Sequence, residues 1–95
     1  MMYTITRLCG GEALMLVPRE DTDSLNLEML LDSLLADGYT ARLDGLMIIM
    51  GWQGMEVTVY ESGKLMFYPL KEKGEAIEHA NRIMDLFHGY AEIKD

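Results

Sequence analysis

The sequence contains few of the residues that mark several protein classes. Its 95 residues include one cysteine and two prolines. A single cysteine, Cys9, excludes an intramolecular disulfide and a zinc site built from several cysteines. No apolar run approaches the roughly 20 residues of a membrane-spanning helix. The opening residues MMYTITRL show no basic stretch followed by a long apolar one, which a secretion signal would have. We therefore expect a cytoplasmic protein with no membrane partner.

Positive charge is also scarce. Eight Lys and Arg residues face sixteen Asp and Glu residues, which gives a formal net charge of −8. Such a balance opposes attraction to the phosphates of nucleic acids and to anionic membranes. Among the partners we consider, a nucleic acid is therefore the least expected.

Motifs of catalysis are missing as well. We find no glycine-rich phosphate loop, no nucleophile motif and no readable pair of catalytic carboxylates. The two histidines, His79 and His88, are nine residues apart in a predicted helix. This spacing is two and a half turns, so the two side chains point to opposite sides and cannot share a metal ion. The sequence therefore predicts a protein that is not an enzyme.

What the sequence does contain is the pattern of one folded domain over residues 1–95. Hydrophobic residues make up 49% of the chain, enough for a single modest core. Alternating residues predict strands at 3–8 and 12–18 around Gly10-Gly11. A helix then begins after Asn26, a residue type that caps helices, and Gly38 ends it. The spacing of its leucines predicts one buried face, formed by Leu27, Leu30, Leu31, Leu34 and Leu35.

The second half of the chain predicts a run of strands and one long helix. The strands are expected at 39–43, 46–50, 55–61 and 64–68, and their short connections make them antiparallel neighbours. A helix is expected from Glu72 to His88, ended by Gly89. Its predicted buried stripe consists of Ala76, Ala80, Ile83, Met84 and Phe87. The expected fold is α+β, in the order β-β-α-β-β-β-β-α, with two helices on one face of a curved antiparallel sheet of five to six strands.

The segment over about residues 12–88 resembles one half-repeat of the TATA-binding protein. The likeness rests on Leu-Asn-Leu-Glu at 25–28, Gly-Leu at 45–46 and the strand–Ser-Gly-Lys–strand hairpin at 57–68, followed by an amphipathic helix. It implies a curved sheet whose convex side carries both helices. Members of that family kink DNA with paired phenylalanine wedges. Here Leu43 and Tyr60 stand at the matching positions, so we expect no DNA binding.

The most informative predicted surface is the sheet face opposite the helices. If the helices pack on Val57, Val59, Leu65 and Phe67, the other face carries Thr58, Tyr60, Met66 and Tyr68, with one set of residues from 46–50. A contiguous apolar surface is seldom left exposed. We therefore expect an unknown protein partner or a second copy of the chain to bind there, unless the strand at 3–8 or the tail at 89–95 covers it.

An acidic connector between the second predicted strand and the first predicted helix is the basis of a second functional hypothesis. Glu20, Asp21 and Asp23 offer carboxylate oxygens of the kind that calcium and magnesium ions prefer, although the loop lacks the spacing of an EF-hand. A binding module for a divalent cation or a small ligand is therefore the second hypothesis. A solvated acidic loop explains the same residues without a metal, and no other cofactor is expected.

Overall fold

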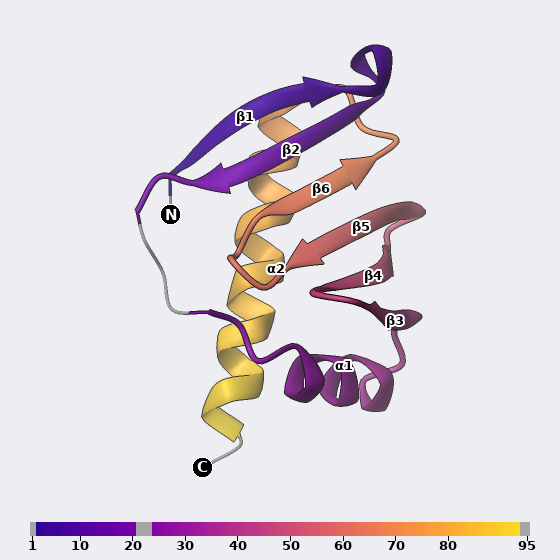
Figure 1. The fold of residues 1–95 in the computed structure, drawn as a ribbon, viewed down its shortest axis with the longest axis vertical. Helices are drawn as coiled ribbons and strands as arrows, with labels where there is room; N and C mark the ends of the chain where they lie inside the picture. The colour runs from indigo at the N-terminus through magenta and orange to yellow at the C-terminus, as the bar shows by residue number, and fades with distance from the viewer. Residues whose placement is uncertain (1, 21–23, 94–95) are drawn as a thin grey trace.

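The computed structural model describes residues 2–20 and 24–93. The described elements are β1 (Tyr3–Leu8), β2 (Ala13–Pro18), α1 (Leu27–Ala36), β3 (Ala41–Asp44), β4 (Met47–Trp52), β5 (Met55–Tyr60), β6 (Leu65–Tyr68) and α2 (Lys73–Ile93), with a short 3-10 turn at Cys9–Gly11. The six strands form one antiparallel sheet in the order β1-β2-β6-β5-β4-β3 (Figure 1). The predicted α+β class and order of elements are confirmed.

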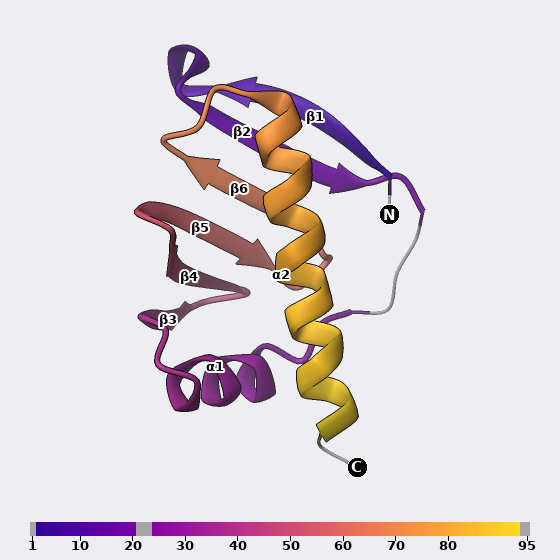
Figure 2. The same ribbon diagram turned by 180° about the vertical axis from the view of Figure 1, so that it is seen from behind.

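Both helices lie on the same face of this sheet. Seen from behind, α2 crosses the strands diagonally and α1 lies beside the β3 end (Figure 2). The core fills the space between the helices and the sheet. Val57, Val59, Leu65 and Phe67 have no exposed surface, as predicted. Within the part of the chain that the structure describes, no helix is both long and apolar enough to cross a membrane.

Helix α1 begins as expected but buries a narrower face. The Asn26 side chain accepts a hydrogen bond from the Met29 amide at 3.1 Å and so caps the first turn. Three leucines are buried, Leu31 is half-buried and Leu35 is 50% exposed. At about 100° per residue, Leu35 lies about 110° from the centre of the buried arc. The prediction that Leu35 belongs to the core is therefore wrong.

Helix α2 buries the predicted stripe but does not end where expected. All five residues of that stripe are buried: Ala76, Ala80, Ile83, Met84 and Phe87. The helix passes through Gly89 and continues to Ile93. Just beyond Gly89, the Tyr90 hydroxyl donates a hydrogen bond to Asp37 at 2.8 Å, which ties this extra turn to the end of α1. The residues expected to form a tail are therefore helical, apart from the last two, which lie outside the described residues.

Two segments that could have covered the open face lie elsewhere. β1 joins the sheet as its outer strand and pairs with β2 along its whole length. The last turn of α2 lies on the helix side of the molecule (Figure 2). The described parts of both segments therefore leave the opposite face of the sheet uncovered.

His79 contributes to the packing between α2 and the sheet. It lies in α2 and is half-buried. Its Nδ1 accepts a hydrogen bond from the indole N–H of Trp52 at 3.1 Å, and its ring lies 6.1 Å from the ring of Phe67. A buried indole N–H needs such an acceptor. His79 therefore links α2 to β4, while His88 is exposed.

Candidate interaction face

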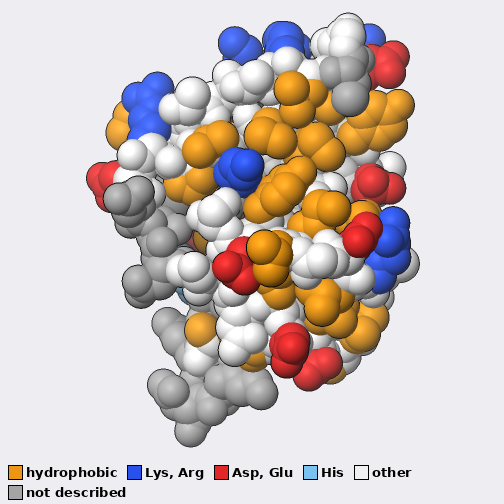
Figure 3. All heavy atoms as spheres, viewed as in Figure 1, with side chains coloured by type: hydrophobic (Ala, Val, Ile, Leu, Met, Phe, Trp, Pro, Cys, Tyr) orange, Lys and Arg blue, Asp and Glu red, His pale blue; other side chains and the backbone are white. Residues whose placement is uncertain are grey.

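The sheet face without helices is called the open face here, and it consists of alternate residues from all six strands. The four residues predicted for it do lie on it together, because Thr58 pairs with Met66 and Glu56 pairs with Tyr68 across β5 and β6. Tyr60 follows Thr58 on the same side of β5. Hydrophobic side chains gather over β1, β2, β6 and β5 in the view of this face (Figure 3).

The four predicted residues differ in how far they can contact a partner. Tyr68 is 43% exposed, and Tyr60 and Met66 are half-buried. Thr58 is only 4% exposed although no helix covers it. Its cross-strand neighbours on the two sides are Ile49 and Met66, whose longer side chains flank it. Thr58 is therefore part of the packing of the face and does not offer a contact surface.

The sequence did not place Met15 on this face, and it left open which alternate residues of 46–50 belong to it. The pairing of strands extends one row across the whole sheet: Thr6, Met15, Met66, Thr58, Ile49 and Arg42. Met15 and Ile49 are half-buried and add apolar surface on both sides of the predicted patch. Alternation within 12–18 could have placed Met15 opposite the core residues Leu14 and Leu16. The order of the strands, which makes Met15 a neighbour of Met66, could not be read from the sequence.

Charges on the open face are balanced. Arg42 lies 3.7 Å from Asp44 in an exposed ion pair at the β3 edge. The Lys64 ammonium lies 4.8 Å from the centre of the Tyr60 ring, a distance typical of a cation–π contact. The strands also place the Glu56 carboxylate on this face. Arg42 and Lys64 are thus the two positive groups, and Asp44 and Glu56 are the two negative groups. The acidic excess of the chain therefore lies mainly on other surfaces.

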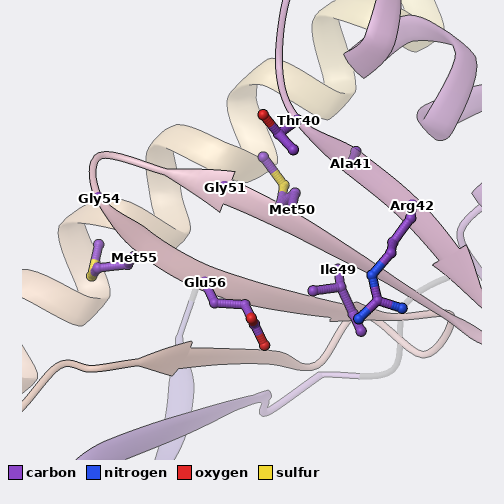
Figure 4. Close-up of a pocket in the computed structure, with 9 residues that line it drawn as sticks. All are labelled: Thr40, Ala41, Arg42, Ile49, Met50, Gly51, Gly54, Met55 and Glu56. Carbon is purple, nitrogen blue, oxygen red and sulfur yellow. The ribbon is translucent and has the colours of Figure 1, made fainter.

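A hollow interrupts the open face where Gly51 supplies no side chain. It has a volume of about 440 Å³ and is bounded by β3, β4 and β5. Ile49 gives it apolar surface, and Arg42 and Glu56 contribute opposite charges, whereas the Met55 side chain points to the other side of β5 (Figure 4). The hollow combines space, apolar contact and hydrogen-bonding groups, which suits an inserted side chain better than a bare charge.

The acidic connector is only partly described. Glu20 is exposed, and Asp21 and Asp23 lie outside the described residues. Across residues 2–20 and 24–93, no three His, Cys, Asp or Glu side chains gather closely enough to hold a metal ion. The divalent-cation hypothesis therefore stays a prediction for the connector, with no second group of ligands to support it elsewhere in the described chain.

Comparison with known proteins gives no relative for this chain. No family model, curated protein or solved structure matches it.

Proposed function

We propose that this chain is a small, non-catalytic interaction protein that binds a second copy of itself through the open face. The observation that carries the proposal is a six-stranded sheet with both helices on one side and an apolar, charge-balanced surface on the other. An apolar face of this kind gains free energy when it leaves water. The resemblance to half of the TATA-binding protein supports the proposal only as a fold-level analogy.

Charge favours a second copy over a strongly charged partner. Two chains of net charge −8 repel each other at long range. On the open face, however, Arg42 and Lys64 offset Asp44 and Glu56, so the face as a whole adds no net charge to the interface, even where two like side chains meet. The balanced face therefore lowers the electrostatic cost of bringing two acidic copies together. The same acidity supports a protein that avoids nucleic acid, and a cytoplasmic location remains part of the proposal.

The size of the face limits how much surface a dimer can bury. Six strands spaced about 4.8 Å apart, four of them with six residues and two with four at roughly 3.3 Å each, outline on the order of 500 Å². A standard interface buries about 800 Å² per partner. Side-chain relief adds to the flat outline, so nearly the whole face is needed. We therefore expect a weak dimer with a dissociation constant of about micromolar size.

Analytical ultracentrifugation over a range of protein concentrations tests the proposal. Met66→Asp places a carboxylate in the middle of the face and should abolish the dimer while the far-UV circular dichroism spectrum is unchanged. Ile77→Ser is the matched control, because Ile77 is 38% exposed on α2. Added salt should tighten the dimer by screening the repulsion between the two net charges. A wild-type chain that stays monomeric at high micromolar concentration contradicts the proposal.

A further inference from the structure

The open face carries a protruding side chain and a recess that could each be filled by a second copy. Tyr68 is the most exposed large hydrophobic side chain that the described strands place on this face, at 43%. The recess is the hollow of about 440 Å³ beside Gly51. Pockets from about 300 Å³ upwards hold whole small molecules, so a single aromatic side chain fits in this volume.

The two features lie in one row of the sheet. Glu56 of β5 pairs with Tyr68 of β6 on one side and with Gly51 of β4 on the other. Tyr68 and Gly51 are therefore two strand spacings apart, roughly 10 Å. A two-fold axis that runs along β5 exchanges their positions. β5 is one of the two middle strands of the six, so this axis also superposes most of one open face on the other.

We infer that, in the dimer proposed above, Tyr68 of each copy enters the Gly51 hollow of the other. This inference rests on the proposed function and adds the register of the two sheets. Such an exchange is self-complementary, as a two-fold interface must be. It buries two aromatic rings near the centre of the interface, where binding energy usually concentrates.

The walls of the hollow suit the chemistry of tyrosine. The Ile49 side chain contacts the apolar part of an inserted ring, and Gly51 leaves the space that the ring occupies. The Arg42 guanidinium can lie over the ring face, where the π electrons attract a cation. The Glu56 carboxylate can accept a hydrogen bond from the tyrosine hydroxyl. A plain aliphatic side chain would use only the first of these contacts.

Two substitutions test the exchange: one fills the Gly51 hollow, and the other removes the Tyr68 ring. Gly51→Val places a side chain in the hollow, and its Cβ meets only the Thr40 Cβ, at an ordinary 3.8 Å. Tyr68→Ser removes the protruding ring. Each variant alone should weaken the dimer by at least about tenfold, the equivalent of about 1.4 kcal/mol. The matched controls are Gly74→Val, where an added Cβ meets nothing, and Ile77→Ser, and both should dimerise like the wild type.

Mixing the two variants gives the decisive measurement. The Gly51→Val copy keeps Tyr68 and the Tyr68→Ser copy keeps the hollow, so a mixed dimer retains one intact contact. Sedimentation of an equimolar mixture should show tighter association than either variant alone. No gain on mixing overturns the inference. Glu56→Gln keeps an acceptor and removes two carboxylates that face each other near the axis, so this variant should dimerise at least as tightly as the wild type; a weaker dimer also overturns it.

The outcomes separate this inference from the proposed function. A monomeric wild-type chain removes both. A wild-type dimer that Met66→Asp disrupts, but that Gly51→Val and Tyr68→Ser leave intact, preserves the proposed function and overturns the exchange of Tyr68. Circular dichroism and urea unfolding of each variant establish that the fold is retained.

Discussion

At the scale of single residues, the Trp52–His79 pair joins the sheet to α2. The indole ring of Trp52 also stacks on Tyr39, with ring centres 5.9 Å apart. Its N–H group is directed to His79 Nδ1, which must carry a lone pair to accept the bond. One histidine thus satisfies the polar atom of a side chain that is only 8% exposed. The fold gains a polar contact that fixes how α2 sits on β4.

Replacing His79 with alanine is expected to lower the free energy of unfolding by about 1–3 kcal/mol, because the Trp52 N–H loses its acceptor. His79→Asn, whose side-chain oxygen can occupy the place of Nδ1, should recover part of the loss. Urea unfolding followed by Trp52 fluorescence measures both effects. His88→Ala, at an exposed position of the same helix, is the control. Equal unfolding midpoints for the two alanine variants would contradict this role of His79.

Tyr90 gives the fold a dependence on alkaline pH. Burial, followed by the hydrogen bond to Asp37, raises the pKa of Tyr90 well above its ordinary value of 10.0. Below pH 10 the hydroxyl is protonated in both the folded and the unfolded chain. Above pH 10 the unfolded chain loses this proton first, so the free energy of unfolding falls as pH rises.

Tyr90→Phe should therefore reduce the slope of unfolding free energy against pH above pH 10. Urea midpoints measured from pH 8 to pH 11.5 test this. A residual slope is expected from Tyr3, whose pKa is raised by burial and by the charge of Asp85. If the phenylalanine variant kept the full wild-type slope, the Tyr90–Asp37 bond would have no part in the alkaline loss of stability.

At the scale of elements, α1 packs on the core through three buried leucines. The buried face of the helix is therefore narrower than the five-leucine face that the sequence pattern predicts. Leu34 has no exposed surface, whereas Leu35 is half exposed. α1 lies at the β3 end of the sheet, where only one side of the helix meets the core (Figure 2). A helix at the edge of the sheet therefore buries fewer residues than the number of apolar residues in its helical repeat.

Leu34→Ala should cost about 2–5 kcal/mol, the usual range for a large-to-small change in a core, out of a total stability of about 5–15 kcal/mol. Leu35→Ala, the adjacent residue of the same type, should cost far less because the side chain already contacts water. Chemical unfolding of the two variants under identical conditions is the measurement. Similar midpoints would mean that Leu34 is not a core residue of the folded chain in solution.

Gly89 lies within α2 and is a place where the helix can be strengthened. An added Cβ there meets no atom within 4 Å. Gly89→Ala should raise the free energy of unfolding by about 0.5–1 kcal/mol, because alanine loses less backbone entropy in a helix. Gly38→Ala is the opposing control, since Gly38 has φ of +92° and alanine would be strained there. A Gly89→Ala variant less stable than the wild type would argue against a helix that passes through this position.

At the scale of the whole molecule, the shape of the sheet and the net charge of the chain favour different kinds of partner. The chain forms an open antiparallel sheet backed by two helices. The sequence resemblance to half of the TATA-binding protein, which stays a prediction, would make such a sheet a DNA-binding saddle. The net charge of −8 opposes the phosphates that such a saddle must approach. Glu56 adds a carboxylate to the face that would meet the duplex. Charge therefore predicts that duplex DNA is not a partner.

We expect no binding to an A·T-rich duplex in a fluorescence-anisotropy titration at about 150 mM salt, where only close charge contacts survive screening. Affinity for duplexes depends first on Lys and Arg neutralising phosphates. Micromolar binding that weakens in Lys64→Glu would contradict this expectation. Lys71→Glu is the control of equal charge change, at an exposed residue outside the strands of the open face.

The sequence by itself determined the local features of this protein. Leucine spacing and Asn26 specified where α1 begins, because capping and periodicity act within a few residues. Alternation in 55–68 placed Val57 and Phe67 on one side and Tyr60 and Tyr68 on the other, because the side-chain period of a strand is two. These features depend on neighbours in the chain.

Only the tertiary structure decided which residues of different elements contact one another. Strand order made Met15 a neighbour of Met66 and left Thr58 buried between longer side chains. The contact between Tyr90 and Asp37 accompanies the continuation of α2 through Gly89, a residue that the local pattern marked as a stop. The Gly51 hollow exists because three strands lie side by side with one side chain missing. Such contacts join residues far apart in the chain, so no local pattern contains them.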